Sequence, residues 1–319
     1  MHDFIDICEI YFGMKEAADA KNKDQKIKLK NLLQMPLLNY IRLSRLNQPT
    51  GIWLLFLPCL FGVFFALKKL PNFDALAIAG IILLFFIGSV VMRSAGCVIN
   101  DLIDQKFDAK VERTKHRPLA SKKISRRGAF VALGILLTLG LLILLQFNEQ
   151  TIFGGLAALA LVVTYPLMKR ITHYPQVFLG LTFNFGILIA SLALLENIAL
   201  STVLLYFACI IWTVIYDTIY AYQDISDDLK IGVKSTAIKF RENPRKILTG
   251  LNFALFLTLT CVGWREHFES GFFLAILVAD LLLNHKIKSC DFSDSQNCLK
   301  VFKANIWVGI LILIAIILG

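Results

Sequence analysis

Residues 75–99, ALAIAGIILLFFIGSVVMRSAGCVI, decide the fold of this chain. Arg93 is the single charged residue in the stretch. At a rise of about 1.5 Å per residue, about 20 apolar residues cross the hydrocarbon core of a bilayer. Only a helix pairs all of its backbone groups within one such segment. The stretch therefore predicts a transmembrane helix.

Similar apolar segments recur along the whole chain of 319 residues, which is 57% hydrophobic and only 18% charged. Soluble domains are about 45–50% apolar and about 25% charged, so this composition excludes an ordinary soluble enzyme, a disordered protein and a disulfide scaffold. We expect an all-α membrane protein with nine spans, and residues 36–319 form its transmembrane domain. The predicted spans are 51–67, 75–99, 129–147, 152–168, 177–195, 199–223, 247–264, 269–283 and 304–319.

The positive charges are placed asymmetrically around these spans. A net charge of +10 could indicate nucleic-acid binding, but 29 of the 33 Lys and Arg residues lie before the first span or in every second loop. Under the positive-inside rule, this puts the N-terminus and the long loops in the cytoplasm and Gly319 on the far side. The partner is a lipid bilayer and not a nucleic acid. Residues 1–35 are a polar N-terminal extension without the features of a signal peptide.

Acidic residues gather at the end of the second span, in RSAGCVINDLIDQKFDAK. Asn100, Asp104 and Asp108 recur at i, i+4 and i+8, which places them on one face of a continuing helix. Asp101 is adjacent, and Arg93 lies two turns earlier on the same stripe. Carboxylates near a membrane are costly, so such a stripe indicates function.

A matching cluster ends the sixth span, in YDTIYAYQDISDDLK. Asp217, Asp224 and Asp228 are spaced by seven and four residues, again one helical face, with Asp227 adjacent. Both clusters lie at the same membrane depth, where bare carboxylates would repel each other. A run of charged residues is usually a solvated helix end. Two acidic stripes at the same depth instead favour a site for a divalent cation. Mg²⁺ fits best, because it binds through one or two carboxylates and bridges to substrate phosphates.

Basic residues accompany each acidic cluster. Arg93, Arg117, Lys169, Arg170 and Lys234 lie beside the clusters or in the loops that follow them. Mg²⁺ together with Lys and Arg is what a departing diphosphate needs, since negative charge grows on its oxygens. The sequence thus predicts a diphosphate site at the cytoplasmic end. The isolated Asp280 is expected to serve packing or a helix end.

The strings RSAGCVINDLIDQKFDAKVERTKHRPLAS and YDTIYAYQDISDDLKIGVKSTA resemble the two Asp-rich signatures of the UbiA-type intramembrane prenyltransferases. The resemblance extends from RLSRLNQPTGIWLLFLPCL, at 42–60, through YPLMKRITHYPQVFLG to the last span. The RTxxRPLxS and YDTxYAxxD segments point to the branch that prenylates 4-hydroxybenzoate for ubiquinone. The resemblance implies a bundle of nine helices around a central cavity and a polyprenyl diphosphate as the other substrate.

The resemblance also implies roles for individual residues. Mg²⁺ ions bridging to the diphosphate would be held by Asn100, Asp104, Asp224 and Asp228. Supporting members of the same acidic shells would be Asp101, Asp108 and Asp227. Lys169 would serve the diphosphate, and Arg170 matches a basic position that the family uses near the substrates. We expect Arg170, with Arg45 as second choice, to hold the acceptor carboxylate. Gln105 departs from the family, because many relatives carry a basic residue there.

The implied reaction ionises the allylic diphosphate, and the acceptor ring attacks the resulting cation. Asp217, two turns deeper than Asp224, is the candidate base for the ring proton. An acceptor of the naphthoate, homogentisate or haem type is the nearest alternative. An ion transporter is a further one, although its charges would lie nearer the midplane. The membrane would be the bacterial inner membrane, or the mitochondrial inner membrane in a eukaryote.

Overall fold

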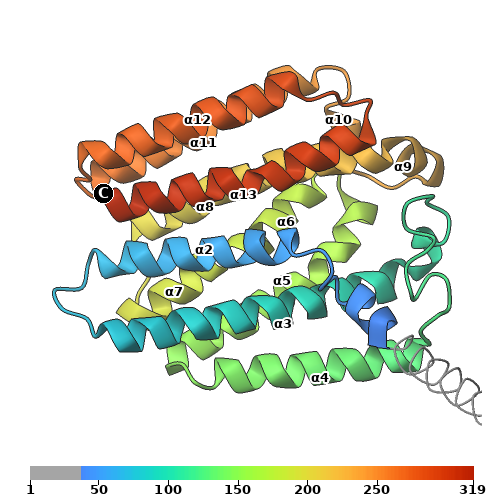
Figure 1. Ribbon diagram of the computed structural model, residues 1–319, viewed down its shortest axis with the longest axis horizontal. Coiled ribbons are helices and arrows are strands. Elements are labelled where there is room, and N and C mark those ends of the chain that lie inside the picture. Colours follow the sequence, from blue (N-terminus) through green and yellow to red (C-terminus); the bar gives the residue numbers. More distant parts are fainter. Residues whose placement is uncertain (1–36) are drawn as a thin grey trace, which may run out of the picture.

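The computed structural model describes residues 37–319. Within this range nine segments are long and apolar enough to cross a membrane, which confirms the predicted architecture (Figure 1). The predicted N-terminal extension lies outside the described residues. The long helices are α2 (Thr50–Leu67), α3 (Ala75–Asp108), α4 (Arg126–Leu144), α5 (Glu149–Ile171), α6 (Pro175–Asn184), α7 (Gly186–Leu195), α8 (Leu200–Ala221), α11 (Pro244–Arg265), α12 (Ser270–Ser289) and α13 (Ser295–Leu318).

Two spans are built from more than one helix. The fifth breaks at Phe185 between α6 and α7. The sixth leaves α8 through the 3-10 turn η1 (Tyr222–Asp224) and continues as the short helix α9 (Ile225–Ile231). A further short helix, α10 (Thr236–Lys239), follows in the loop. The expectation that the second acidic cluster lies on one uninterrupted helix was therefore wrong, because the 3-10 turn changes the angular spacing between residues.

The helices differ in how much of their surface is covered by protein. α8 is the central helix, and its Trp212 and Tyr216 are almost fully buried between α2, α11 and α13. α4 lies at the periphery and buries a single residue, Ala129. α4 therefore exposes almost its whole length to lipid.

Asp280 lies between two neighbouring helices. This residue of α12 accepts a hydrogen bond of 2.5 Å from Asn252 of α11, as expected for a packing role.

Figure 1 shows that the helices run roughly parallel to the long axis of the molecule. α9, α10 and the loop between α3 and α4 lie together at one end, and Gly319 lies at the other. α3 continues past its predicted end at 99 to Asp108, so its acidic stripe projects toward this loop-rich end. The two acidic clusters thus meet at the same end of the bundle.

Candidate active site

A cavity of about 1550 Å³ starts at the acid-bearing end and reaches into the apolar interior. Carboxylates from α3, α8, η1 and α9 line its polar end. An apolar arm lies between α3, α4 and α5 and is lined by Leu84, Phe85, Met92, Leu141, Leu144 and Leu156, among others. Of the fourteen residues predicted for the site, thirteen line this cavity and only Asp101 does not. The cavity fits an amphiphile with a charged head and a long apolar tail.

Asp101 lies behind the cavity wall and joins three segments of the chain. Its carboxylate, 1% exposed, accepts hydrogen bonds from Arg45 Nη2 at 2.8 Å and from Arg117 Nη1 at 3.2 Å. Arg117 Nη1 also donates to Asp108 at 2.8 Å. Arg45 has the left-handed backbone conformation, with φ 56°, which is costly for a residue other than glycine. Asp101 therefore fixes Arg45 and Arg117 at the cavity wall, and the structure does not bring it among the metal-facing oxygens.

The last turn of α5 presents two basic side chains to the α3 stripe. Lys169 Nζ donates to Asp104 at 2.8 Å and to Asn100 Oδ1 at 3.4 Å. Arg170 Nη2 donates to the carbonyl of Ile103 at 3.1 Å and lies 3.5 Å from Asp104. Both cations therefore lie at the acidic end of the cavity.

The second acidic cluster is only partly paired. Asp224 forms an ion pair with Arg113, and Asp227 accepts from the backbone N–H of Glu112 at 3.2 Å. Within residues 37–319, the side chains of Asp217 and Asp228 form no hydrogen bond or ion pair with protein, and both line the cavity. These two carboxylates are available to a ligand or a proton.

Arg113 lines the cavity as well, although the sequence analysis did not single it out. Besides pairing with Asp224, its Nη1 donates to the Tyr220 hydroxyl at 2.6 Å, and its guanidinium lies 5.0 Å from the Tyr220 ring centroid. Burial alone would lower the pKa of Arg113, but Tyr220 and Asp224 outweigh burial and hold it above its usual value. Arg113 is the first arginine of the RTxxRP string, which could have indicated it; the sequence analysis selected only the second, Arg117.

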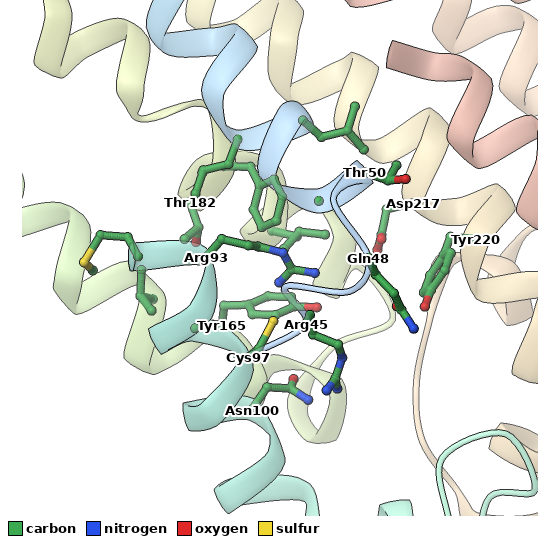
Figure 2. A pocket seen from close by; sticks show the side chains of 18 of the residues that line it. Arg45, Gln48, Thr50, Arg93, Cys97, Asn100, Tyr165, Thr182, Asp217 and Tyr220 are labelled. Carbon is green, nitrogen blue, oxygen red and sulfur yellow. The ribbon is translucent and has the colours of Figure 1, made fainter. Parts of the chain in front are cut away.

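Arg93 extends from α3 into the cavity, two turns before Asn100 on the membrane side of the acidic stripe (Figure 2). Its Nε is buried and has no hydrogen-bond partner among the described residues. Its guanidinium lies 5.4 Å from the centroid of the Phe183 ring. A Cβ placed on Gly51 of α2 would meet Arg93 Nε and lie 2.9 Å from Nη2, so a larger residue there would displace the end of the arginine side chain. Arg93 is half-buried and has no protein partner among the described residues, which indicates an anionic ligand that supplies the missing partner.

Lys234 closes the site from the loop after α9. Its Nζ donates to the carbonyl of Ile171 at 3.1 Å, and its backbone N–H donates to the carbonyl of Lys169 at 3.0 Å. Cations near the C-terminus of a helix satisfy its last carbonyl groups. Lys234 therefore attaches this loop to the end of α5.

The oxygen-rich wall fits a hard divalent cation that is completed by a ligand. Among the described residues no three carboxylates or imidazoles already form a coordination sphere. The available donors are carboxylate and amide oxygens on opposing walls of one cavity. Mg²⁺ keeps several waters and binds through one or two carboxylates together with substrate phosphates. The arrangement suits a metal that arrives with a diphosphate.

Comparison with known proteins agrees with this geometry. A sequence profile of the UbiA prenyltransferase family matches residues 55–309. The rat mitochondrial 4-hydroxybenzoate polyprenyltransferase is 44% identical over 292 residues, which cover 91% of this chain and 76% of the rat protein. The human mitochondrial 4-hydroxybenzoate polyprenyltransferase is 42% identical over 287 residues, which cover 89% and 76% of the two chains.

Solved structures share the fold. A UbiA homolog from Aeropyrum pernix K1 superposes with a TM-score of 0.66 at 22% identity, covering 82% of this chain and 96% of that one. A UbiA homolog from Archaeoglobus fulgidus, solved with GPP and Mg²⁺, has a TM-score of 0.62 at 20% identity and covers 86% and 99%. At this identity the likeness establishes the helical architecture.

Proposed function

The chain belongs to the UbiA prenyltransferase family, and we propose that it transfers a polyprenyl group to 4-hydroxybenzoate in ubiquinone biosynthesis. Polyprenyl diphosphate is the donor, the ring carbon ortho to the phenol is the acceptor atom, and diphosphate is released. One observation carries this proposal. A single cavity joins an acid-and-cation end, a deep unpaired arginine and an apolar arm. These are the environments that a diphosphate, an aromatic carboxylate and a prenyl tail require.

The diphosphate binds at the acidic end. Mg²⁺, which the A. fulgidus homolog was solved with, would be held by Asn100, Asp104, Asp224 and Asp228, with Asp108 and Asp227 as neighbours. When bound, it withdraws electron density from the leaving oxygens. Lys169 pairs with Asp104 and Arg113 pairs with Asp224, so both cations lie beside the carboxylates that would hold the metal. When the diphosphate is bound, they can donate hydrogen bonds to its oxygens. Their positive charge stabilises the negative charge that grows as the C–O bond breaks.

The acceptor lies deeper, and its carboxylate pairs with Arg93. 4-Hydroxybenzoate is an anion at neutral pH, and burying it unpaired would be costly. Arg170, which the sequence favoured for this role, lies instead beside Asp104 and is 43% exposed. Arg45, the second choice, is held by Asp101. Only Arg93 combines a deep position with an unsatisfied donor, so this role passes to it and Arg170 joins the diphosphate end.

The remaining residues protect the allylic cation and take up the proton. Aromatic faces of Phe183, Tyr165 and Tyr216 line the cavity and attract a cation without reacting with it. The ring carbon forms the new C–C bond, and the proton on that carbon passes to the Asp217 carboxylate, which lines the same cavity (Figure 2). The apolar surroundings exclude the water that would otherwise capture the cation.

The chain is a multi-span membrane protein. The rat and human relatives are named as mitochondrial. In a eukaryotic cell we place this chain in the mitochondrial inner membrane, and in a bacterium in the cell inner membrane. In both, the acid-bearing end with its basic loops faces the matrix or the cytoplasm, according to the positive-inside rule.

The test is an assay on purified protein in liposomes with labelled polyprenyl diphosphate and Mg²⁺. 4-Hydroxybenzoate, a dihydroxynaphthoate and homogentisate are offered in parallel, and the lipid product is identified by mass. We expect prenylation of 4-hydroxybenzoate alone. A product formed only from another acceptor would overturn the assignment and keep the family.

A further inference from the structure

Two cysteine side chains meet where α12 joins α13. Cys290 follows the last residue of α12, and Cys298 is the fourth residue of α13. Both residues are 0% exposed. The Cys298 thiol donates to the carbonyl of Asp291 at 3.4 Å, and the backbone N–H of Asp291 donates to Asn297 Oδ1 at 3.0 Å. These two bonds close residues 290–298 into a loop and bring its first and last residues together.

The two sulfur atoms are in contact. The Cys290 thiol donates a hydrogen bond to Cys298, and this bond, together with burial, raises the pKa of Cys290. Both cysteines are reduced in the structure. A disulfide needs two side chains that point toward each other with their sulfurs close together. Cys290 and Cys298 therefore need little movement to be joined.

A short exposed loop covers this pair. It lies at the acid-bearing end of the molecule, beside α9 and α10 (Figure 1). Asp291 and residues 293–296 are exposed, whereas Phe292 is half-buried. Segments with few buried contacts open locally at low cost, so a small oxidant reaches the thiols without unfolding of the bundle. In the cytoplasm or matrix, where we place this end, thiols are kept reduced and the disulfides that form are transient, catalytic or redox-sensing.

The first turns of α13 also form part of the reaction cavity. Ser295, Gln296 and Leu299 line the cavity, while Cys298 lies on the buried side of the same segment. α13 packs against η1, which ends at Asp224 of the second acidic cluster. A movement of Cys298 therefore displaces both a wall of the cavity and a carboxylate that we assign to Mg²⁺.

The Cys290 side of the pair is anchored to α11. Arg245 Nη2 donates to the carbonyl of Cys290 at 2.8 Å, and its guanidinium lies 5.6 Å from the Phe292 ring centroid. Phe292 in turn packs on Tyr222 of η1, with ring centroids 4.7 Å apart. The Tyr222 hydroxyl is buried without a hydrogen-bond partner among the described residues, so packing holds this side chain. A bond between the two cysteines would therefore move α13 and η1 more than α11.

We propose that Cys290 and Cys298 form a reversible disulfide on exposure to a peroxide, and that this disulfide lowers the activity of the enzyme. The inference rests on the proposed function, since it names a regulation of that site. One sulfur attacks the O–O bond of hydrogen peroxide and becomes a sulfenic acid, with release of one water. The other sulfur attacks the sulfenic sulfur, the S–S bond forms, and a second water leaves. Two thiols are oxidised, and one hydrogen peroxide is reduced to two waters.

The disulfide changes the reaction site through the position of its groups. To bond with Cys290, the Cys298 sulfur leaves the Asp291 carbonyl, and the start of α13 shifts with it. Gln296 at the cavity wall and Asp224 in η1 then shift relative to the α3 cluster. Coupling between separate sites changes affinity by about 5-fold to 150-fold, and we expect turnover to fall about fivefold.

The experiment measures the disulfide and the activity in the same samples. The purified chain in liposomes is reduced with dithiothreitol and then treated with hydrogen peroxide. Mass spectrometry of the peptide that holds both cysteines detects the loss of two hydrogens, and turnover is measured with 4-hydroxybenzoate, polyprenyl diphosphate and Mg²⁺. The variants are Cys290→Ser and Cys298→Ser. Cys261→Ser is the matched control, because it removes an exposed thiol of α11 and keeps the pair.

The outcomes separate this pair from the other thiols. In wild type and Cys261→Ser we expect peroxide to form the disulfide and to lower turnover about fivefold, with recovery after dithiothreitol. Cys290→Ser and Cys298→Ser should keep their turnover. Cys97 lines the reaction cavity, so its oxidation would lower turnover in both of these variants as well. An equal fall in all four proteins, a disulfide that leaves turnover unchanged, or treated wild type without the disulfide would overturn the proposal.

The same samples test the proposed function separately. Reduced wild type that is inactive on 4-hydroxybenzoate would overturn that function. The mass of the peptide still reports the disulfide in this case, so the two failures are distinguishable. If one of the two serine variants is poorly produced, the other removes the same bond.

Discussion

The two acidic clusters carry the same residue types but are built differently. The α3 cluster lies on one helix, Ala75–Asp108, and its carboxylates are paired with cations from three other segments. The second cluster is divided among α8, η1 and α9, and two of its carboxylates have no partner among the described residues. The first is a fixed wall, and the second is the side that can adapt to metal and substrate.

The difference follows from local backbone structure. An uninterrupted helix keeps residues at i, i+4 and i+8 on one face, and Asp101 then anchors the stripe from behind. In the second cluster the 3-10 turn interrupts the periodicity, and α9 ends at Gly232 with φ 74°. Asp227 and Asp228 occupy the first turn of α9, where carboxylates interact favourably with the helix N-terminus. Asp228 has no ion pair among the described residues, and Asp227 forms only a long one, with Lys230 at 3.6 Å.

The largest effect on turnover should come from removing one carboxylate from either acidic cluster. We expect Asp104→Ala and Asp224→Ala each to lower turnover by at least about 100-fold, because loss of a group that positions a metal costs 10–100-fold or more. EDTA should abolish wild-type turnover, and added Mg²⁺ should restore it. Glu149→Ala, an acid at the opposite end, is the control. If Asp224→Ala kept more than about a tenth of the activity, the two clusters would not form one metal site.

The free energy of unfolding should depend more on the carboxylates of the α3 cluster than on those of the second cluster. Asp101→Asn leaves Arg45 without its buried counter-charge and removes one of the two carboxylates that pair with Arg117, and we expect a loss of about 3 kcal/mol in unfolding free energy. Asp227→Asn loses the exposed ion pair with Lys230 at 3.6 Å, which contributes about 0.3–0.5 kcal/mol, and keeps an oxygen to accept from the backbone N–H of Glu112. Thermal unfolding in detergent compares the two. Equal melting temperatures would mean that Asp101 does not anchor the wall.

The sequence predicted the α3 side better than the α8–α9 side for the same reason. Helical periodicity holds along α3, so the positions of Asn100, Asp104 and Asp108 could be derived. No glycine or proline marks the 3-10 turn at Tyr222–Asp224, and the periodicity was extended across it. The nine spans could be predicted because hydropathy depends on local composition, whereas the break between α6 and α7 at Phe185 lies within one predicted span.

Side-chain partners are the part that no spacing rule could supply. The role of Asp101 behind the wall depends on Arg45, which is 56 residues away in the chain. Similarly, Arg93 and Arg170 are both basic residues near an acidic stripe. Only the fold separates the unpaired one deep in the cavity from the exposed one at its mouth.

A smaller effect should distinguish these two arginines. Arg93→Ala should raise KM for 4-hydroxybenzoate by about tenfold or more, since a hydrogen bond to a charged group contributes about 1.5–3 kcal/mol. KM for the prenyl donor should change little. Arg170→Ala should show the reverse pattern, and Arg93→Lys should recover part of the loss because a point charge replaces a planar donor. Initial rates with each substrate varied in turn measure both constants. A rise in acceptor KM with Arg170→Ala alone would return the carboxylate to Arg170.

The smallest effect concerns how the fixed wall holds Arg93. Gly51→Ala places a methyl group against the Arg93 guanidinium, at 2.9 Å from Nη2 before any adjustment. The rigid α3 backbone cannot retreat, so the end of the side chain must move, and we expect acceptor KM to rise by about threefold to tenfold, or ~0.7–1.4 kcal/mol. Gly250→Ala is the matched control, because a Cβ there meets nothing within 4 Å. Alanine also favours a helix more than glycine does, so neither variant should lose stability. If Gly51→Ala left acceptor KM unchanged but lowered the melting temperature, Gly51 would serve the packing of α2 and not the placement of Arg93.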